Sequence, residues 1–257
     1  TENFGNPSNL YDFGREAKQA VEKANAKITK VLNCKPNELI FTGSATEADN
    51  LAIAGTARAN KSVGNKIIIS NIEHKAVISV SRALQKEGFE IVELPVQKNG
   101  LINLEELKNS LDKKTILVSV MYANNEIGTI QPIAEIGTLI KKTNPKILFH
   151  TDAVQAANFL DCDVKKLGVD LLTLSGHKIY GPKGVGALYV KRGTPIEPII
   201  YGGGHERGLR SGTENVAGIV GLGQAIKEIQ NPKLKIQNIR IRQFRDKLIK
   251  TILKIIP

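Results

Sequence analysis

Short apolar runs alternate along this chain with longer segments in which apolar positions recur every three or four residues. Runs bounded by small or polar residues predict buried strands, and the longer spacing predicts amphipathic helices. Strands are expected at 38–42, 66–70, 90–94, 115–122, 146–149 and 170–174. Helices are expected at 14–33, 47–58, 77–84, 133–142, 215–229 and 234–256, the first of them ending at Asn33, ahead of Pro36. The alternation over residues 38–190 predicts an α/β fold with a mostly parallel central sheet.

The composition is that of a globular chain with a basic surface. Its 257 residues are 41% hydrophobic and 24% charged, which suits one large core or two small ones. The 36 Lys and Arg against 25 Asp and Glu give a net charge of +11, but the lysines are scattered along amphipathic helices and aromatic residues make up only 5%. We therefore expect acidic protein partners and no nucleic-acid binding. No apolar run approaches the ~20 residues that cross a bilayer, so no membrane partner is expected.

Two cysteines, Cys34 and Cys162, occur without CxxC spacing, and the chain has no HExxH motif. Neither a metal site nor a disulfide framework is therefore predicted. Reduced cysteines fit the cytoplasm, with the mitochondrial matrix as the alternative. The chain begins with Thr1 and has no basic-then-apolar signal pattern, so we expect a fragment or a processed chain.

The first candidate site is Ser175-Gly-His-Lys178, which follows the predicted strand 170–174. Lys178 is therefore expected at the carboxyl end of a strand, where open α/β sheets bind their ligands. A lysine in a partly dry cleft has a lowered pKa, and its neutral amine can form a Schiff base with a carbonyl. With 36 Lys and Arg in the chain, a surface lysine is the simpler interpretation of this residue taken alone.

An acidic partner stands 26 residues earlier. Asp152 follows the predicted strand 146–149, and the gap to Lys178 is wide enough for one βαβ crossover. An aspartate in this place can pair with a protonated ring nitrogen, the way pyridoxal phosphate (PLP) is held as an electron sink. Taken alone, Asp152 is equally a helix cap or a solvated loop acid, and only its pairing with Lys178 makes it specific.

A turn of small residues, 43–46, leads from the strand 38–42 into the helix 47–58. Free backbone N–H groups and the helix dipole converge at such a turn, which makes it an anion site. Ala45 and Thr46 are the candidates for binding a phosphate, with the Thr46 hydroxyl as an additional donor. The alternative is simple helix capping by Ser44 or Thr46.

These motifs form an ordered set that spans most of the chain. The matching stretches are Phe41-Thr-Gly-Ser-Ala-Thr-Glu47, Glu73-His-Lys75, Asn124-Asn-Glu-Ile-Gly128, Thr151-Asp-Ala-Val-Gln155, Ser175-Gly-His-Lys178 and Gly202-Gly-Gly-His-Glu-Arg-Gly-Leu-Arg-Ser-Gly-Thr213. Together they resemble the class V aminotransferase family of PLP enzymes, and more narrowly its cysteine desulfurases. The stretch Lys178-Ile-Tyr-Gly-Pro-Lys-Gly184 with the later glycine-rich loop is similar to the group that serves nitrogenase and general iron–sulfur cluster assembly.

The resemblance implies roles for individual residues. Lys178 would hold PLP covalently and, with His74, move protons, while Asp152 would keep the ring nitrogen protonated. His74 would also stack on the ring. The matching residues that would bind the cofactor are Ala45, Thr46, His74, Asn125 (in preference to Asn124), Asp152, Gln155, Ser175, His177, Lys178 and Thr213. Thr213 would reach the phosphate of a neighbouring subunit, which implies a homodimer.

The resemblance also implies an organisation into domains. Residues 1–230 would form the three-layer large domain of a PLP-dependent transferase, and residues 231–257 the start of a truncated small domain. The segment ahead of Phe4-Gly-Asn-Pro7 and the carboxyl-terminal region would be missing. That region carries the family's carboxylate-binding arginine and its thiolate nucleophile, and neither Cys34 nor Cys162 matches the nucleophile's motif.

The implied function is PLP-dependent desulfuration of L-cysteine, with sulfur transfer. L-Alanine and an enzyme persulfide would be the products, and iron–sulfur scaffold or other sulfur-acceptor proteins would be the partners. The alternatives are another class V enzyme, such as an aminotransferase or a selenocysteine lyase, and a non-catalytic scaffold. We expect the 257-residue chain alone to bind PLP without sustaining desulfuration.

Overall fold

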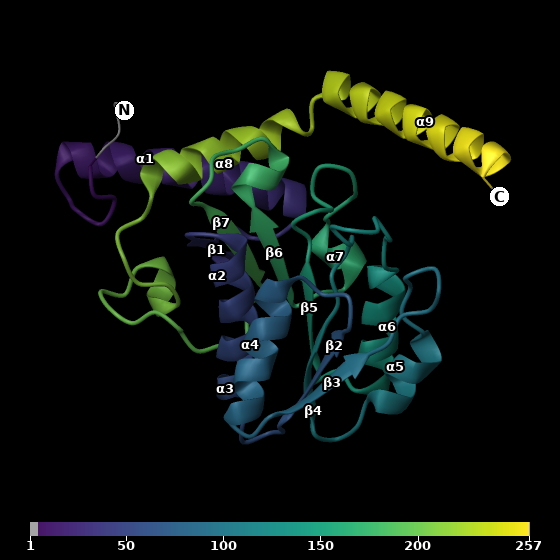
Figure 1. The fold of residues 1–257 in the computed structure, drawn as a ribbon. Helices are drawn as coiled ribbons and strands as arrows, with labels where there is room; N and C mark the ends of the chain where they lie inside the picture. Colours follow the sequence, from purple (N-terminus) through teal and green to yellow (C-terminus); the bar gives the residue numbers. More distant parts are fainter. Residues whose placement is uncertain (1–4, 257) are drawn as a thin grey trace.

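The computed structural model describes residues 5–256, and within this range seven strands form one sheet in the order β1-β7-β6-β5-β4-β2-β3 (Figure 1). The strands are β1 (Leu39–Thr42), β2 (Lys66–Ser70), β3 (Glu90–Leu94), β4 (Thr115–Ser119), β5 (Leu148–Asp152), β6 (Leu171–Ser175) and β7 (Gly186–Val190). The strands β2 to β6 pair in parallel, and β7 runs antiparallel to both of its neighbours. The expected mostly parallel α/β sheet is thus confirmed. The expectation for the chain start at Thr1 lies outside the described residues.

Helices cover both faces of the sheet and make three layers (Figure 1). On one face lie α2 (Ala45–Asn50), α3 (Thr56–Ala59) and α4 (Lys75–Lys86). On the other lie α1 (Asp12–Leu32), α5 (Leu104–Ser110), α6 (Ile133–Thr143), α7 (Val164–Leu167) and α8 (Val216–Glu228). A π-helical turn, Leu51–Gly55, joins α2 to α3 in one continuous helical segment. Short 3₁₀ turns lie at Pro36–Glu38, Gly176–Ile179 and Glu206–Gly208.

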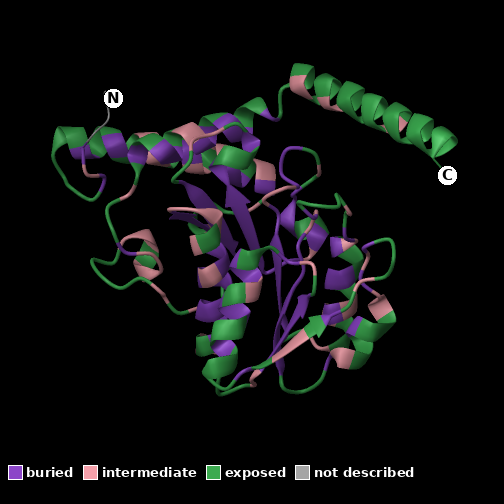
Figure 2. Ribbon diagram, viewed as in Figure 1, coloured by how far each residue is buried: buried purple, intermediate pink, exposed green. Residues whose placement is uncertain are grey.

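The burial of the strands explains their uniform apolar character. Every residue of β1, β2, β4, β5, β6 and β7 is buried, because helices cover both faces of the sheet. The edge strand β3 is partly exposed and carries Glu90 and Glu93 (Figure 2). Polar residues within the buried strands are therefore exceptions, and they gather near the carboxyl ends of β4, β5 and β6.

Several element boundaries differ from the sequence expectation. The helix expected from residue 47 begins at Ala45, because the Ser44 side chain caps it by accepting the N–H of Glu47 at 3.1 Å. The strand expected at 146–149 continues to Asp152 as β5, and the strand expected to reach residue 122 ends at Ser119.

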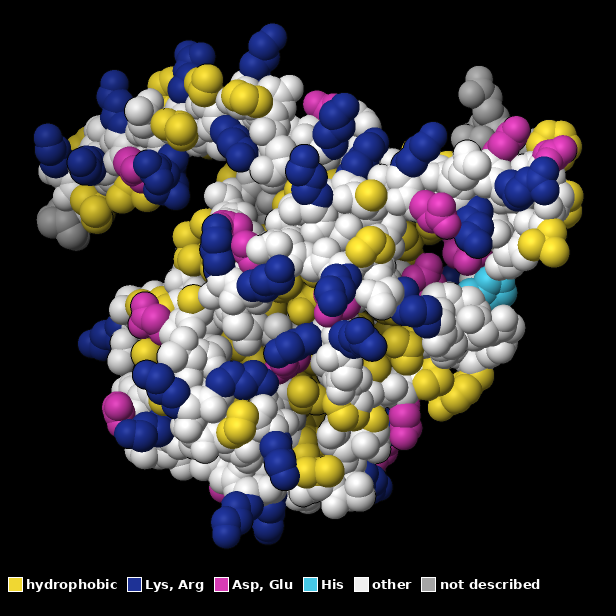
Figure 3. Space-filling view, turned by 180° about the vertical axis from the view of Figure 1, so that it is seen from behind, with side chains coloured by type: hydrophobic (Ala, Val, Ile, Leu, Met, Phe, Trp, Pro, Cys, Tyr) yellow, Lys and Arg dark blue, Asp and Glu magenta, His cyan; other side chains and the backbone are white. Residues whose placement is uncertain are grey.

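The last helix, α9 (Pro232–Ile255), extends away from the body and has no buried residue (Figures 1 and 2). It begins at Pro232 and not at the expected residue 234, because Asn231 caps it by accepting the N–H of Lys233 at 3.0 Å and Pro232 occupies its first turn. Lysines and arginines are spread over the face of the molecule seen in Figure 3 and do not gather in one patch. Among the described residues, no helix is both long and apolar enough to span a membrane.

Candidate active site

The sheet topology brings the carboxyl ends of β2, β5 and β6 to one edge. Asp152 is the last residue of β5, Ser175 is the last residue of β6, and His74 follows β2. Lys178 stands on the 3₁₀ turn directly after β6. Parallel neighbours end at the same edge of a sheet, so residues separated by about a hundred positions meet there. Asp152 and Lys178, which the sequence analysis paired, thus lie at the same edge of the sheet.

Asp152 is buried, with 5% of its surface exposed. Its Oδ1 accepts the N–H of Val154 at 2.8 Å. Burial raises the pKa of the carboxyl above its usual value, although the Val154 N–H and the charges of Lys178 and of a protonated His74 lower it in part. An aspartate in these surroundings is stabilised as a carboxylate by any further cation placed beside it. It is thus a buried carboxyl at the end of a strand, and not the solvated loop acid of the simpler interpretation.

Lys178 and His177 are exposed. The sequence argument expected a partly dry cleft around Lys178. In the described part of the chain Lys178 is exposed instead, because the 3₁₀ turn carries it beyond Ser175, the last buried residue of β6. Ser175 is buried, and its Oγ lies 3.0 Å from Nδ1 of His177. Partial burial, and then the charge of Lys178, lowers the pKa of His177.

His74 is exposed and caps the amino end of α4. Its Nδ1 accepts the N–H of Ala76 at 3.2 Å. An Nδ1 that accepts a hydrogen bond is unprotonated in that arrangement, so the neutral ring carries its proton on Nε2. This fixes both the orientation of the imidazole and the nitrogen that is available for proton transfer.

The small-residue turn 43–46 leads from β1 into α2. Ser44 caps the helix, as the alternative interpretation proposed, so the amides of Ala45 and Thr46 begin the first turn, where backbone N–H groups have no partner within the helix. Gly186 of β7 packs against this turn, and a Cβ on it would lie 2.6 Å from the carbonyl carbon of Ser44. The absence of a side chain at position 186 therefore allows the turn to lie against the sheet.

The two asparagines after β4 have different surroundings. Asn124 is buried, its Nδ2 donates to the carbonyl of Ile72 at 2.8 Å, and its Oδ1 accepts the N–H groups of Glu126 and Ile127. Asn124 thus holds the loop in shape, whereas Asn125 is exposed. Gln155, in the turn that follows β5, is half-buried. This difference agrees with the choice of Asn125 over Asn124 as the candidate ligand.

Thr213 does not join the residues around Asp152. It lines a separate cavity of about 210 Å³ near Gly43, Glu206 and Arg210. The glycine-rich loop before it is fastened along the edge strand β1: Glu206 accepts the N–H of Phe41 at 3.0 Å, and Arg207 donates to the carbonyl of Leu39 at 2.9 Å. Thr213 is exposed at the end of this fastened loop.

A buried polar cluster beneath the site was not predicted. It contains Asp49, Glu73 and His150, which are 1%, 5% and 0% exposed. Glu73 lies inside a quoted motif without an assigned role, and His150 and Asp49 lie just outside quoted motifs. The available signal was polar residues in buried strands, since Ser119, His150 and Thr173 are buried in β4, β5 and β6 beside apolar residues.

Both cysteines lie in unreactive surroundings. Cys162 is buried and Cys34 is half-buried, and both are free thiols. Burial first, and then Asp161, raises the pKa of Cys162 to about 12, and burial with Glu38 raises that of Cys34 to about 12. Among the described residues, no group of three His, Cys, Asp or Glu side chains could hold a metal ion.

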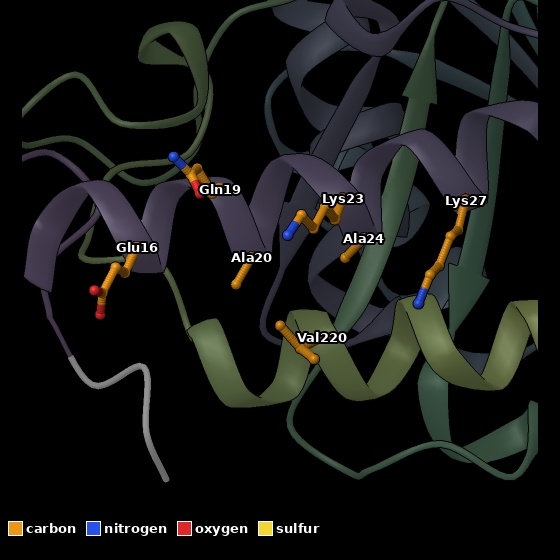
Figure 4. Close-up of a pocket in the computed structure, with 7 residues that line it drawn as sticks. All are labelled: Glu16, Gln19, Ala20, Lys23, Ala24, Lys27 and Val220. Atoms are coloured by element: carbon orange, nitrogen blue, oxygen red, sulfur yellow. The ribbon is translucent and has the colours of Figure 1, made fainter.

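The other concavity of the surface is remote from these residues. It has a volume of about 300 Å³ and lies in the groove between α1 and α8, lined by residues that include Lys23, Lys27 and Val220 (Figure 4). None of the candidate site residues lines it. The candidate site is thus defined by the sheet edge.

Known proteins resemble this chain over its whole length. A family model described as aminotransferase class-V matches residues 1–256. The cysteine desulfurase IscS of Clostridium botulinum (strain Hall) is 53% identical over 257 residues, which are 100% of this chain and 64% of that protein. The cysteine desulfurase IscS of Methanosarcina thermophila is 50% identical over 255 residues, which are 99% of this chain and 62% of that protein.

Solved structures give the same result. A NifS-like protein superposes with a TM-score of 0.94 at 42% identity, over 98% of this chain and 69% of that one. A structure described as SspA in complex with cysteine superposes with a TM-score of 0.84 at 40% identity, over 88% of this chain and 65% of that one. The chain thus spans somewhat less than two thirds of the length of the curated relatives it matches. Because the family model matches nearly every residue, the chain belongs to the class-V aminotransferase family, whose members use PLP.

Proposed function

We propose that this chain is the cofactor domain of a PLP-dependent cysteine desulfurase. The observation that carries the proposal is the meeting of Asp152, Lys178 and His74 at one edge of the sheet, in a chain about 50% identical to cysteine desulfurases. The net reaction takes sulfur from L-cysteine onto a cysteine thiolate, leaving L-alanine and an enzyme persulfide. The SspA structure described as a complex with cysteine supports cysteine as the substrate.

The residues present fit PLP. An exposed primary amine, Lys178, lies at the same sheet edge as a buried carboxyl, Asp152, whose pKa is raised by burial and lowered in part by the charge of Lys178. The amides of Ala45 and Thr46, with Ser175 and His177, would hold the phosphate, and Lys178 would hold the cofactor covalently. When bound, PLP supplies an electron sink for charge that develops at the substrate Cα.

The side chains of this chain have separate tasks. Asp152 would be held ionised by the protonated ring nitrogen of bound PLP, because a buried carboxylate is stabilised by an adjacent cation. His74 would stack on the ring and move a proton at Nε2, since its Nδ1 is engaged with Ala76. Lys178 would share the proton transfers at Cα. Asn125 and Gln155 would donate to the ring oxygen.

The thiolate that accepts sulfur is not provided by residues 1–257 in this proposal. Thiols are nucleophilic as thiolates, and burial raises the pKa of both Cys34 and Cys162 to about 12. At neutral pH both are therefore protonated, in addition to being at least partly covered. The acceptor thiolate would come from outside these residues.

We propose the remaining features of the organisation on the same basis. Residues 1–230 form the PLP-binding large domain and residues 231–257 begin a small domain, which agrees with α9 lying apart from the core. Thr213, exposed at the end of the glycine-rich loop, serves the phosphate of the second subunit in a cytoplasmic homodimer. Iron–sulfur scaffold or sulfur-acceptor proteins then receive the persulfide sulfur.

The test is covalent mapping of the cofactor. Purified protein mixed with PLP should gain a visible absorption band, lose it on borohydride reduction, and give a reduced adduct on the peptide that contains Lys178. Lys178→Ala should remove the adduct, whereas Lys183→Ala, a neighbouring exposed lysine, should keep it. An adduct on another lysine would refute the assignment. A correctly placed adduct in a longer protein that transfers amino groups and releases no sulfur would point to the aminotransferase alternative.

A further inference from the structure

Three carboxyl side chains are buried together beneath the carboxyl ends of β2 and β5. Asp49 of α2 is 1% exposed, and Glu73 and Asp152 are each 5% exposed. Burial raises the pKa of both Asp49 and Glu73, and the charge of Asp152 raises both further. Neighbouring carboxyls in a dry interior do not all ionise together, since each charge disfavours the next. The protons of the cluster therefore have a preferred distribution.

The unpartnered oxygens of Asp49 and nearby charge favour Asp152 as the first to ionise. Asp152 accepts the N–H of Val154 at 2.8 Å, neither of its oxygens is buried without a partner in the described part of the chain, and the positive charge of Lys178 lowers its pKa. Asp49 lacks comparable stabilisation. Among the described residues, neither of its buried oxygens accepts a hydrogen bond of ordinary geometry, and the Thr173 hydroxyl nearby offsets only part of the burial.

His150 does not act as the missing cation for Asp49. Its Nε2 lies 3.6 Å from Oδ1 of Asp49, but the ring is fully buried, and burial lowers the pKa of the imidazole to about 3. The neutral ring bridges two hydroxyls, with Nδ1 2.8 Å from Oγ of Ser119 and Nε2 3.1 Å from Oγ of Thr173. Thr173 is the partner of Asp152 in the register of β5 and β6. His150 thus connects Asp49 to the strand pair that carries Asp152 without adding charge.

Glu73 approaches the cluster from the turn after β2. Its Oε1 accepts the hydroxyl of Ser70 at 2.5 Å and the N–H of Met121 at 2.7 Å, while its buried Oε2 has no partner among the described residues. Burial raises the pKa of this carboxyl to about 8 in spite of the two donors. At neutral pH the protonated form therefore predominates.

We propose that Asp49 and Glu73 are buried beneath the cofactor site as neutral acids, so that Asp152 carries the single negative charge of the cluster. The inference rests on the proposed function in one respect. If PLP binds as proposed, the full negative charge of Asp152 would be available to its ring nitrogen. A second carboxylate in the cluster would raise the pKa of Asp152 and draw a proton onto it. The neutral acids prevent this while retaining their packing and hydrogen bonds.

The order of ionisation can be measured directly. Protein with ¹³C-labelled aspartate and glutamate carboxyls is titrated by NMR without PLP, and the signals are assigned with Asp49→Asn, Glu73→Gln and Asp152→Asn. Asp152 should ionise first as the pH rises, with Asp49 and Glu73 still protonated at neutral pH. Ionisation of Asp49 or Glu73 before Asp152 would overturn the proposal.

The variants give a second, independent readout. Because asparagine at position 49 and glutamine at position 73 are neutral like the acids they replace, the titration midpoint of Asp152 should stay within about half a pH unit in both. A downward shift of about one unit or more would mean that the replaced carboxyl was charged, and the proposal would fail. Both replacements keep the side-chain shape, so the measurement does not depend on a variant with a cavity.

The affinity for PLP then tests whether the charge of the cluster matters for cofactor binding. The Kd for PLP should change less than about threefold in Asp49→Asn and Glu73→Gln, and rise about thirtyfold or more in Asp152→Asn, which loses a buried charge pair. Equal weakening in all three variants would contradict a special role for Asp152. The NMR titration is done without PLP, so its result is valid even if the chain is not a desulfurase. Failure of PLP binding alone would count against the proposed function and not against the order of ionisation.

Discussion

Arg210 donates from Nε to Oε1 of Glu47 at 2.8 Å, joining the glycine-rich loop to the start of α2. The other oxygen of Glu47 accepts the N–H of Gly43 at 3.0 Å, within the turn that precedes the helix. One carboxylate thus bridges two segments that lie 163 residues apart in sequence. The pair is mostly covered, with side-chain exposures of 22% and 18%. The anion turn and the loop that carries Thr213 are therefore held as one unit.

Removing this bridge should weaken both folding and PLP binding. We expect Arg210→Ala to lower the free energy of unfolding by about 1 to 3 kcal/mol, because the Glu47 carboxylate loses a charged donor in a partly buried place. The Kd for PLP should rise at the same time, because the turn that would bind the phosphate loosens. Urea unfolding and PLP titration measure the two effects.

Arg82→Ala is the matched control for the Arg210 experiment. The pair of Arg82 with Glu93 is 3.7 Å long and exposed, so its loss should cost less than about 1 kcal/mol. Equal costs for the two arginines would show that the Glu47 bridge does not organise the turn.

Gly186→Ala should distort the anion turn from the opposite side. The new Cβ would lie 2.6 Å from the carbonyl carbon of Ser44 and 2.8 Å from the amide nitrogen of Ala45, and backbone atoms cannot move aside as a flexible side chain can. Overpacking of this kind costs about 1 to 3 kcal/mol. We expect thermal unfolding at a lower temperature and a loss of PLP affinity. Gly203→Ala, whose Cβ would meet only the His205 side chain, should leave both nearly unchanged.

The positions of the main site residues were predictable because strand order follows simple rules. Apolar runs that end shortly before Asp152 and Ser175 place those residues at one edge once the strands are parallel. The end of the first helix at Asn33 agrees with the left-handed conformation of that residue, with φ 55°. Position along the chain was enough for these predictions.

Burial and charge balance were not predictable in the same way. The exposure of Lys178 depends on the 3₁₀ turn after β6, and the neutral state of His150 depends on its burial among neighbours from two strands and a helix. Asp49 looks like an ordinary helix residue until its contacts are known. Such properties arise from tertiary packing, which no local pattern records.

Glu206 should make stability depend on pH in the acid-to-neutral range. Burial raises the pKa of its carboxyl from 4.5 to about 7. In that interval the folded chain binds the proton more tightly than the unfolded chain, so the stability contributed by this group falls as the pH rises from about 4.5 to about 7. Glutamine can still accept the N–H of Phe41 and has no charge to bury, so Glu206→Gln should remove this slope.

Denaturant unfolding at a series of pH values compares Glu206→Gln with Glu105→Gln, which changes an exposed carboxyl. Only the former should flatten the profile between about pH 4.5 and about pH 7. An unchanged slope in Glu206→Gln would mean that the Glu206 carboxyl titrates as if it were in water.

The two thiols should be unreactive, and the 257-residue chain should not release sulfide. With each pKa raised to about 12, only about one thiol in ten thousand is ionised at pH 8. Alkylation by iodoacetamide should therefore be slow in the folded protein and fast after unfolding. With PLP and L-cysteine, sulfide and alanine should form no faster than with free PLP, and Cys34→Ser and Cys162→Ala should match the parent. If the chain releases sulfide faster than free PLP and either substitution abolishes this release, the acceptor thiolate lies within this chain, because no other residue here could carry the persulfide.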